Sequence, residues 1–328
     1  MLATASRWVG FVALATLVGG LVVELVALPR ATPVVDGARR RLRRLGVLCL
    51  VVLLATTAAD LVTRAQTMAG GALPGAIAAL PAVLTHTHFG AVWITRFALL
   101  ALALVLAGGT SRALRAASLG LALAIALTTT LTGHAADWGD LTLSAGIDWV
   151  HVVATTAWTG GLIALALAVL REARQWPPGV LGGCMRRFSR LARFCVTAVV
   201  ATGLYNAWVQ LPGPAALVTT IYGRALAVKL VLVLGLLWWG AVNRYTVVPA
   251  LDRDRAADAG GRGIRLARWL FREPSRGHRA APSRLNAFVA REAMLAILVF
   301  ACTALLVDST PPRHVEHGEH GAGSSGSR

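Results

Sequence analysis

Long apolar segments alternate with short polar ones along most of this chain. Eight of these segments hold almost no charge and approach the roughly 20 residues that an α-helix needs to cross ~30 Å of hydrocarbon. They lack the alternation of apolar and polar residues that marks a lipid-facing barrel strand. The pattern therefore predicts an all-α, polytopic membrane bundle of eight transmembrane helices, over about residues 7–28, 45–68, 87–108, 117–135, 146–170, 194–211, 225–248 and 291–307.

The composition agrees with a membrane protein. Of the 328 residues, 56% are hydrophobic and 14% are charged, whereas a soluble domain carries about 25% charged residues. The first apolar segment resembles a signal peptide in position only. Met1–Ser6 lacks the basic residues that open a signal peptide, and Trp8–Leu28 is long for its apolar core. We therefore expect a true membrane span there.

The basic residues are distributed unevenly over the segments between these spans. Four of the segments (29–44, 109–116, 171–193 and 249–291) hold 24 Lys and Arg residues, whereas the alternate segments and the C-terminal tail hold three. The positive-inside rule then predicts that the basic segments are cytoplasmic and that both termini lie outside. The net charge of +17 is thus mainly a signal of membrane topology. It does not indicate nucleic-acid binding, since the basic residues are spread over short loops with few aromatic residues among them.

Two pairs of short motifs suggest an internal repeat. Thr87-His88-Phe89-Gly90 with Arg96 matches Thr220-Ile221-Tyr222-Gly223 with Lys229, and Gly19-Gly20-Leu21 matches Gly160-Gly161-Leu162. The motifs predict two tandem four-helix halves in the same orientation. The membrane domain then covers residues 1–311, with halves of about 1–140 and 141–311. The tail, 312–328, is rich in His and then in Gly and Ser, and we expect it to be disordered outside the membrane.

The histidines gather on the predicted outer side, and His278 alone lies in a cytoplasmic loop. Neutral imidazole is the commonest protein ligand of Zn and Cu(II). Four histidines fall at the outer edge of the spans and form the predicted metal site: His86, His88, His134 and His151. We expect His88, rather than His86, to point inward.

Two carboxylates and the tail add to this predicted site. Asp148 lies three residues before His151 on one helical face, so it can hold the imidazole N–H as outer ligands of metal sites commonly do. Asp137 similarly lies three residues after His134. The tail carries three further histidines at intervals of three, for which we expect an auxiliary role in metal capture: His314, His317 and His320.

Ionisable residues also occur at membrane depth, where charges are costly and are usually paired or functional. Asp60 and Arg64 are four residues apart and are expected to pair within one span. Further ionisable residues at this depth are Glu24, Arg96, Lys229 and Glu292. The chain has neither a phosphate-binding G-x-x-x-x-G-K-[ST] motif nor a Cys-Pro-Cys motif, so we expect a binding or transport protein rather than an enzyme.

Several of these motifs together resemble the copper resistance D (CopD) family. The resemblance rests on Asp148-Trp149-Val150-His151, Trp158-Thr159-Gly160-Gly161-Leu162, Gly133-His134-Ala135, Thr202-Gly203-Leu204-Tyr205, Tyr222-Gly223 with Lys229 and Asn243, and Arg291-Glu292 with Pro311-Pro312. It covers nearly the whole chain. It implies copper transport at the inner membrane, beside a periplasmic copper-binding partner of the CopC type. The direction of transport stays open.

Two other functions fit the same histidines. His134 and His151 on facing helices would also suit the iron of haem b in a membrane redox protein or oxidase. Alternatively, the chain binds copper as an accessory protein without passing it across the membrane. The sequence alone leaves these alternatives open.

Overall fold

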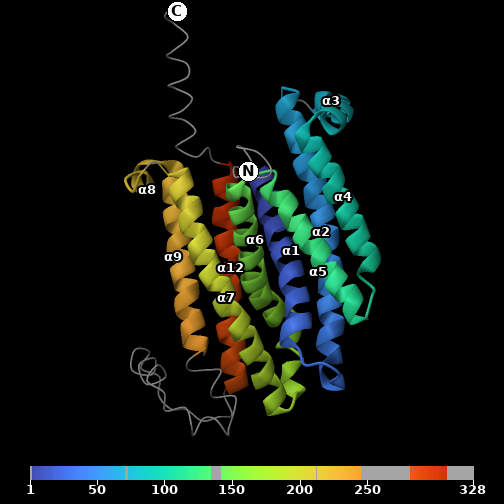
Figure 1. Cartoon of the computed structure of the whole chain (residues 1–328), viewed down its shortest axis with the longest axis vertical. Helices are drawn as coiled ribbons and strands as arrows, with labels where there is room; N and C mark the ends of the chain where they lie inside the picture. The colour runs from blue at the N-terminus through green and yellow to red at the C-terminus, as the bar shows by residue number, and fades with distance from the viewer. Residues whose placement is uncertain (1, 71–72, 134–141, 212, 245–280, 309–328) are drawn as a thin grey trace, which may run out of the picture.

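A computed structural model describes residues 2–70, 73–133, 142–211, 213–244 and 281–308. Every regular element in these residues is helical, and the long helices lie side by side in one bundle (Figure 1). The α-helices are α1 (Leu2–Val22), α2 (Asp36–Met68), α3 (Leu73–His86), α4 (His88–Leu106), α5 (Arg112–Thr130), α6 (Leu143–Ala164), α7 (Pro178–Gln210), α8 (Ala216–Thr219), α9 (Ile221–Val242) and α12 (Ala281–Asp308). Short π-helical turns, η1 (Val23–Ala27) and η4 (Leu165–Val169), continue α1 and α6, and 3-10 turns occur at η2 (Pro33–Val35) and η5 (Ala173–Gln175).

Within the described residues, seven helices are long and apolar enough to cross a membrane: Ala3–Ala27, Pro33–Met68, His88–Leu106, Arg112–Thr130, Leu143–Val169, Ile221–Val242 and Leu285–Val307. They correspond to seven of the eight predicted spans. The remaining predicted span, 194–211, lies within α7, which is helical but is not among the seven. Polar residues on α7, including Thr202, Asn206 and Gln210, reduce its apolar character.

Two of the segments between the predicted spans contain helix. The outer segment 69–86 includes α3, whose composition is largely Ala and Leu and which tolerates Pro81 in its interior. Thr87 then separates α3 from α4, and its side chain accepts a hydrogen bond from the Gly90 amide. The arginine-rich segment 29–44 likewise forms the first turns of α2. The ends of the predicted apolar segments thus differ from the ends of the helices, because helix also forms outside the predicted spans.

The helices α1 and α6 pack against each other at the centre of the bundle (Figure 1). Their contact is formed by the glycines of the repeated motif. A Cβ atom added to Gly160 would overlap the carbonyl group of Ala15, and one added to Gly19 would overlap the backbone of Gly160 and Gly161. Small residues allow such backbone approach between membrane helices. The glycine pairs therefore set the distance between α1 and α6.

Arginines bind the C-terminal end of α1, where the π-helical turn η1 ends the helix. Arg112 donates to the carbonyl oxygen of Leu25 at 3.2 Å, and Arg187 donates to that of Ala27 at 3.2 Å. Glu24, in the same turn, pairs with Arg115 at 3.0 Å, and both side chains are less than a tenth exposed. Arginines from α5 and α7 therefore fasten these helices to the end of α1.

Candidate metal site

The candidate site begins in the first turns of α6. Thr142 caps this helix, and its hydroxyl accepts a hydrogen bond from the Ala145 amide at 3.2 Å. Asp148 and His151 follow, three residues apart, on one helical face. Both are half-buried. The cap thus fixes the start of the helix that carries the two predicted site residues.

The imidazole of His151 is held by α7. Its Nδ1 lies 2.9 Å from the hydroxyl of Thr202, and that hydroxyl donates its proton to the carbonyl oxygen of Ala198 at 2.6 Å. With its own proton directed to Ala198, the Thr202 oxygen is placed to accept a hydrogen bond from Nδ1–H, and in that tautomer the lone pair of neutral imidazole lies on Nε2. Gly203 leaves room for the ring, since a Cβ at this position would lie 3.3 Å from its Cε1 atom.

The carboxylate of Asp148 connects three helices. Its Oδ2 accepts a hydrogen bond from Thr130 of α5 at 3.0 Å, and its Oδ1 accepts one from Asn206 of α7 at 3.1 Å. The sequence led us to expect that Asp148 would orient His151, whereas Thr202 makes the hydrogen bond to the imidazole. The spacing of Thr202 and Asn206, four residues apart on one helical face, was the signal that could have identified both partners.

A cation lies near this carboxylate. Lys229 of α9 interacts electrostatically with Asp148 and His151. Tyr222 precedes Lys229 on α9. Its hydroxyl donates a short hydrogen bond to Gln210 at the end of α7. A carboxylate and an imidazole from α6, both hydrogen-bonded to α7, therefore lie close enough to an ammonium group of α9 to interact with it electrostatically.

The structure places the other predicted ligands as follows. His86 ends α3 and His88 begins α4, and both are exposed, which differs from the inward direction expected for His88. His134, Asp137, His314, His317 and His320 lie outside the described residues. Among the residues that are described, no three His, Cys, Asp or Glu side chains are grouped so as to hold one metal ion. Of the predicted set, Asp148 and His151 are the pair that the structure brings together.

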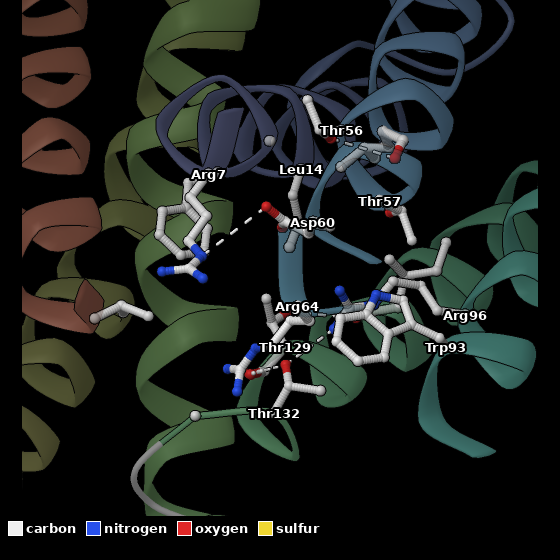
Figure 2. A pocket seen from close by; sticks show the side chains of 16 residues that line it. Arg7, Leu14, Thr56, Thr57, Asp60, Arg64, Trp93, Arg96, Thr129 and Thr132 are labelled. Atoms are coloured by element: carbon white, nitrogen blue, oxygen red, sulfur yellow. Dashed lines mark hydrogen bonds and ion pairs between the residues drawn. The ribbon is translucent and has the colours of Figure 1, made fainter. Parts of the chain in front are cut away.

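A second polar site lies in the first half of the chain. It is a cavity of about 100 Å³ between α1, α2, α4 and α5, and Figure 2 shows Arg7, Asp60, Trp93 and Arg96 around it. Asp60, which was expected to pair with Arg64, forms an ion pair with Arg7 at 3.9 Å and also interacts electrostatically with Arg64 and Arg96. The guanidinium of Arg96 donates to the hydroxyl and the carbonyl oxygen of Thr128 and to the hydroxyl of Thr132.

Comparisons with known proteins match two ranges of the chain, which contain some of the motifs that suggested the family. Residues 1–143 match the family model for the copper resistance protein D-like N-terminal domain. Residues 182–306 match the model for copper resistance protein D. The helix α6, with Asp148 and His151, lies between the two matched ranges.

Two characterised sequences are similar to this chain. One is the copper transport protein CutJ of Bacillus subtilis, which is 31% identical over 49% of this chain and 31% of its own length. The other is the inner membrane protein YebZ of Escherichia coli, which is 30% identical over 52% of this chain and 60% of its own length. The chain thus spans less than two thirds of either relative. No solved structure matches it significantly. With both family models matched and seven helices suited to a bilayer, the chain belongs to the copper resistance D family of multi-pass membrane proteins.

Proposed function

We propose that this protein binds copper at the outer edge of the bacterial cytoplasmic membrane and transports it across. The arrangement around His151 is the observation that carries this proposal. Its Nδ1–H is bound by Thr202, so that Nε2 presents a lone pair, which is the form of imidazole that ligates metals. Copper is the cargo in this mechanism, and His151 is its first ligand.

Further ligands complete the proposed site. His86, His88 and His134 join His151, with Asp148 and Asp137 in supporting positions, and the tail residues His314, His317 and His320 capture the ion from outside. A periplasmic protein of the CopC type exchanges copper with this edge. The name of CutJ supports copper as the ion, and that of YebZ supports the inner membrane as the location.

The proposed topology has eight spans, with α7 as the sixth in sequence and both termini outside. The distribution of arginines supports this orientation. The polar residues that keep α7 from resembling a typical span support it as well, because Thr202 and Asn206 face His151 and Asp148 inside the bundle. Polar groups of a membrane helix are expected on its protein-facing side.

The two halves form tandem repeats in this proposal. Both contain a long first helix that ends in a π-helical turn, η1 after α1 and η4 after α6. Both contain a Thr cap, Thr87 or Thr220, whose side chain accepts from a Gly amide three residues on. In both, an indole N–H donates to a distant backbone carbonyl, from Trp8 to Ile297 and from Trp149 to Leu123.

A transport assay on proteoliposomes tests this function. Vesicles that contain the purified full-length protein are expected to exchange copper across the membrane faster than protein-free vesicles, and the purified protein should contain copper by elemental analysis. The absorption spectrum of the same sample is the control for the haem alternative. A Soret band without copper would contradict the proposal, and tight copper binding without flux would reduce it to an accessory role.

Replacing Thr202 by Val tests how His151 is held. The change removes the oxygen that accepts from Nδ1–H and keeps the side-chain shape, so we expect copper affinity to fall by about tenfold, as outer partners of metal ligands typically give. The matched control is Thr197→Val. Thr197 lies on the same helix, is exposed and makes the same kind of hydrogen bond to the carbonyl four residues before it. Equal affinities for the two variants in a chelator competition titration would show that Thr202 does not position the ligand.

A further inference from the structure

The cavity in the first half occupies the place that corresponds to the His151 site. The start of α1, Arg7-Trp8-Val9-Gly10, aligns with Asp148-Trp149-Val150-His151 of α6. The contacts correspond as well. A Cβ on Gly10 would lie 3.1 Å from the hydroxyl of Thr56, just as His151 contacts the hydroxyl of Thr202. Glycine thus stands where the second half has its imidazole, and a cavity lies beside it.

The charges of the two sites are reversed. Arg7 stands where the second half has Asp148, and its partner is Asp60 at the position of Asn206. Arg96 stands where the second half has Lys229. The charged side chains that line the cavity, within the described part of the chain, are three arginines and one aspartate: Arg7, Arg64, Arg96 and Asp60. A site of this composition attracts an anion rather than a metal cation.

The cavity also contains two buried polar atoms that make no hydrogen bond within the described residues. One is the indole N–H of Trp93, which is 3% exposed, and the other is Oδ1 of Asp60, which is 3.9 Å from Arg7. A buried donor without a partner is costly, so an acceptor for the Trp93 N–H is expected in the cavity. Threonine hydroxyls on α2 and α5, among them Thr57 and Thr129, lie around the same space (Figure 2). The volume of about 100 Å³ exceeds the ~10–15 Å³ that a cavity needs to hold one water.

We infer that this cavity binds a small inorganic anion of the size of chloride. The indole N–H of Trp93 donates to the anion, and the guanidinium groups of Arg7, Arg64 and Arg96 supply the positive potential. The carboxylate of Asp60 opposes binding and limits the affinity. The two halves therefore hold ions of opposite charge, a metal cation in the second half and an anion in the first.

Chloride binding to the copper-free, full-length protein in detergent tests this inference. Titration by calorimetry in gluconate buffer at constant ionic strength is expected to show saturable binding of chloride. Trp93→Phe removes the donor and should weaken binding by about tenfold or more. Asp60→Asn removes the like charge and should strengthen it by about tenfold. Trp208→Phe is the matched control, since Trp208 is 69% exposed, and it should leave the affinity unchanged.

The two opposite changes separate binding from loss of the fold, because a misfolded variant would not gain affinity. Absence of saturable chloride binding in the wild-type protein would show that the cavity holds only water and would overturn the inference. So would equal affinities for the Trp93 and Trp208 variants, or weaker binding by Asp60→Asn. Because the titration is done without copper, its result is independent of whether the second half transports that metal.

Discussion

Replacing His151 by Ala is expected to lower the affinity for copper by about 100-fold or more. The change removes the proposed metal ligand, and loss of an outer partner alone commonly costs 10–100-fold in affinity. Removal of residues 313–328 is expected to change the affinity much less, because the proposed role of the tail histidines is capture rather than the primary site. A competition titration of the two purified proteins with a chromophoric copper chelator measures both effects.

Two outcomes would change this assignment. If deletion of 313–328 lowers the affinity as much as His151→Ala does, the primary site lies in the tail. If neither change has an effect, the ligands are to be sought at His86, His88 and His134. The variant His278→Ala is a control, since this histidine lies in the predicted cytoplasmic loop, and its copper affinity should equal that of the wild type.

Replacing Gly160 by Ala is expected to have the largest effect on stability. The added methyl group would overlap the carbonyl of Ala15, and this neighbour is backbone, which cannot move aside as a flexible side chain can. Overpacking of a core costs about 1–3 kcal/mol and occasionally more, so we expect a loss of about 3 kcal/mol. Titration with dodecyl sulfate in mixed micelles, followed by circular dichroism, measures the free energy of unfolding.

The control for this variant lies on the same helix. Gly146 has no atom within 4 Å of an added Cβ, so Gly146→Ala should be neutral or slightly stabilising, because Ala is a better helix former than Gly by about 1 kcal/mol. If both variants unfold at the same detergent concentration, α1 and α6 do not depend on the glycine contact, and their packing would have to be reconsidered.

Much of the fold could be predicted from hydropathy because a bilayer imposes a simple length rule on apolar segments. The rule applied less well to α7. Its polar residues Thr202 and Asn206 lower its apolar character, and both contact partners inside the bundle. A length rule also says nothing about helices that extend beyond the apolar core, which explains why α3 and the arginine-rich start of α2 were expected to be loops.

The candidate site was less predictable, for a different reason. Sequence position along a span gives the depth of a residue in the membrane but not its place around the bundle. His86, His88 and His151 share a predicted depth, whereas α4 packs on α2 and α5, and α6 packs on α1 and α7. The surroundings of Asp60 show the same limit. Spacing suggested Arg64 within one helix, and the structure adds Arg7 from another helix and Arg96 from a third.

The arginines at the end of α1 have a consequence for biogenesis. If they hold this end of the chain in the cytoplasm during insertion, then Arg112 and Arg187 can bind the carbonyl groups of Leu25 and Ala27 only after α5 and α7 have entered the membrane. The arginines that orient a newly inserted pair of helices would then also connect that pair to α1. Correct orientation would thus be a precondition for assembly. A pair inserted the other way round would place its arginines on the opposite side of the membrane from the carbonyl groups at the end of α1.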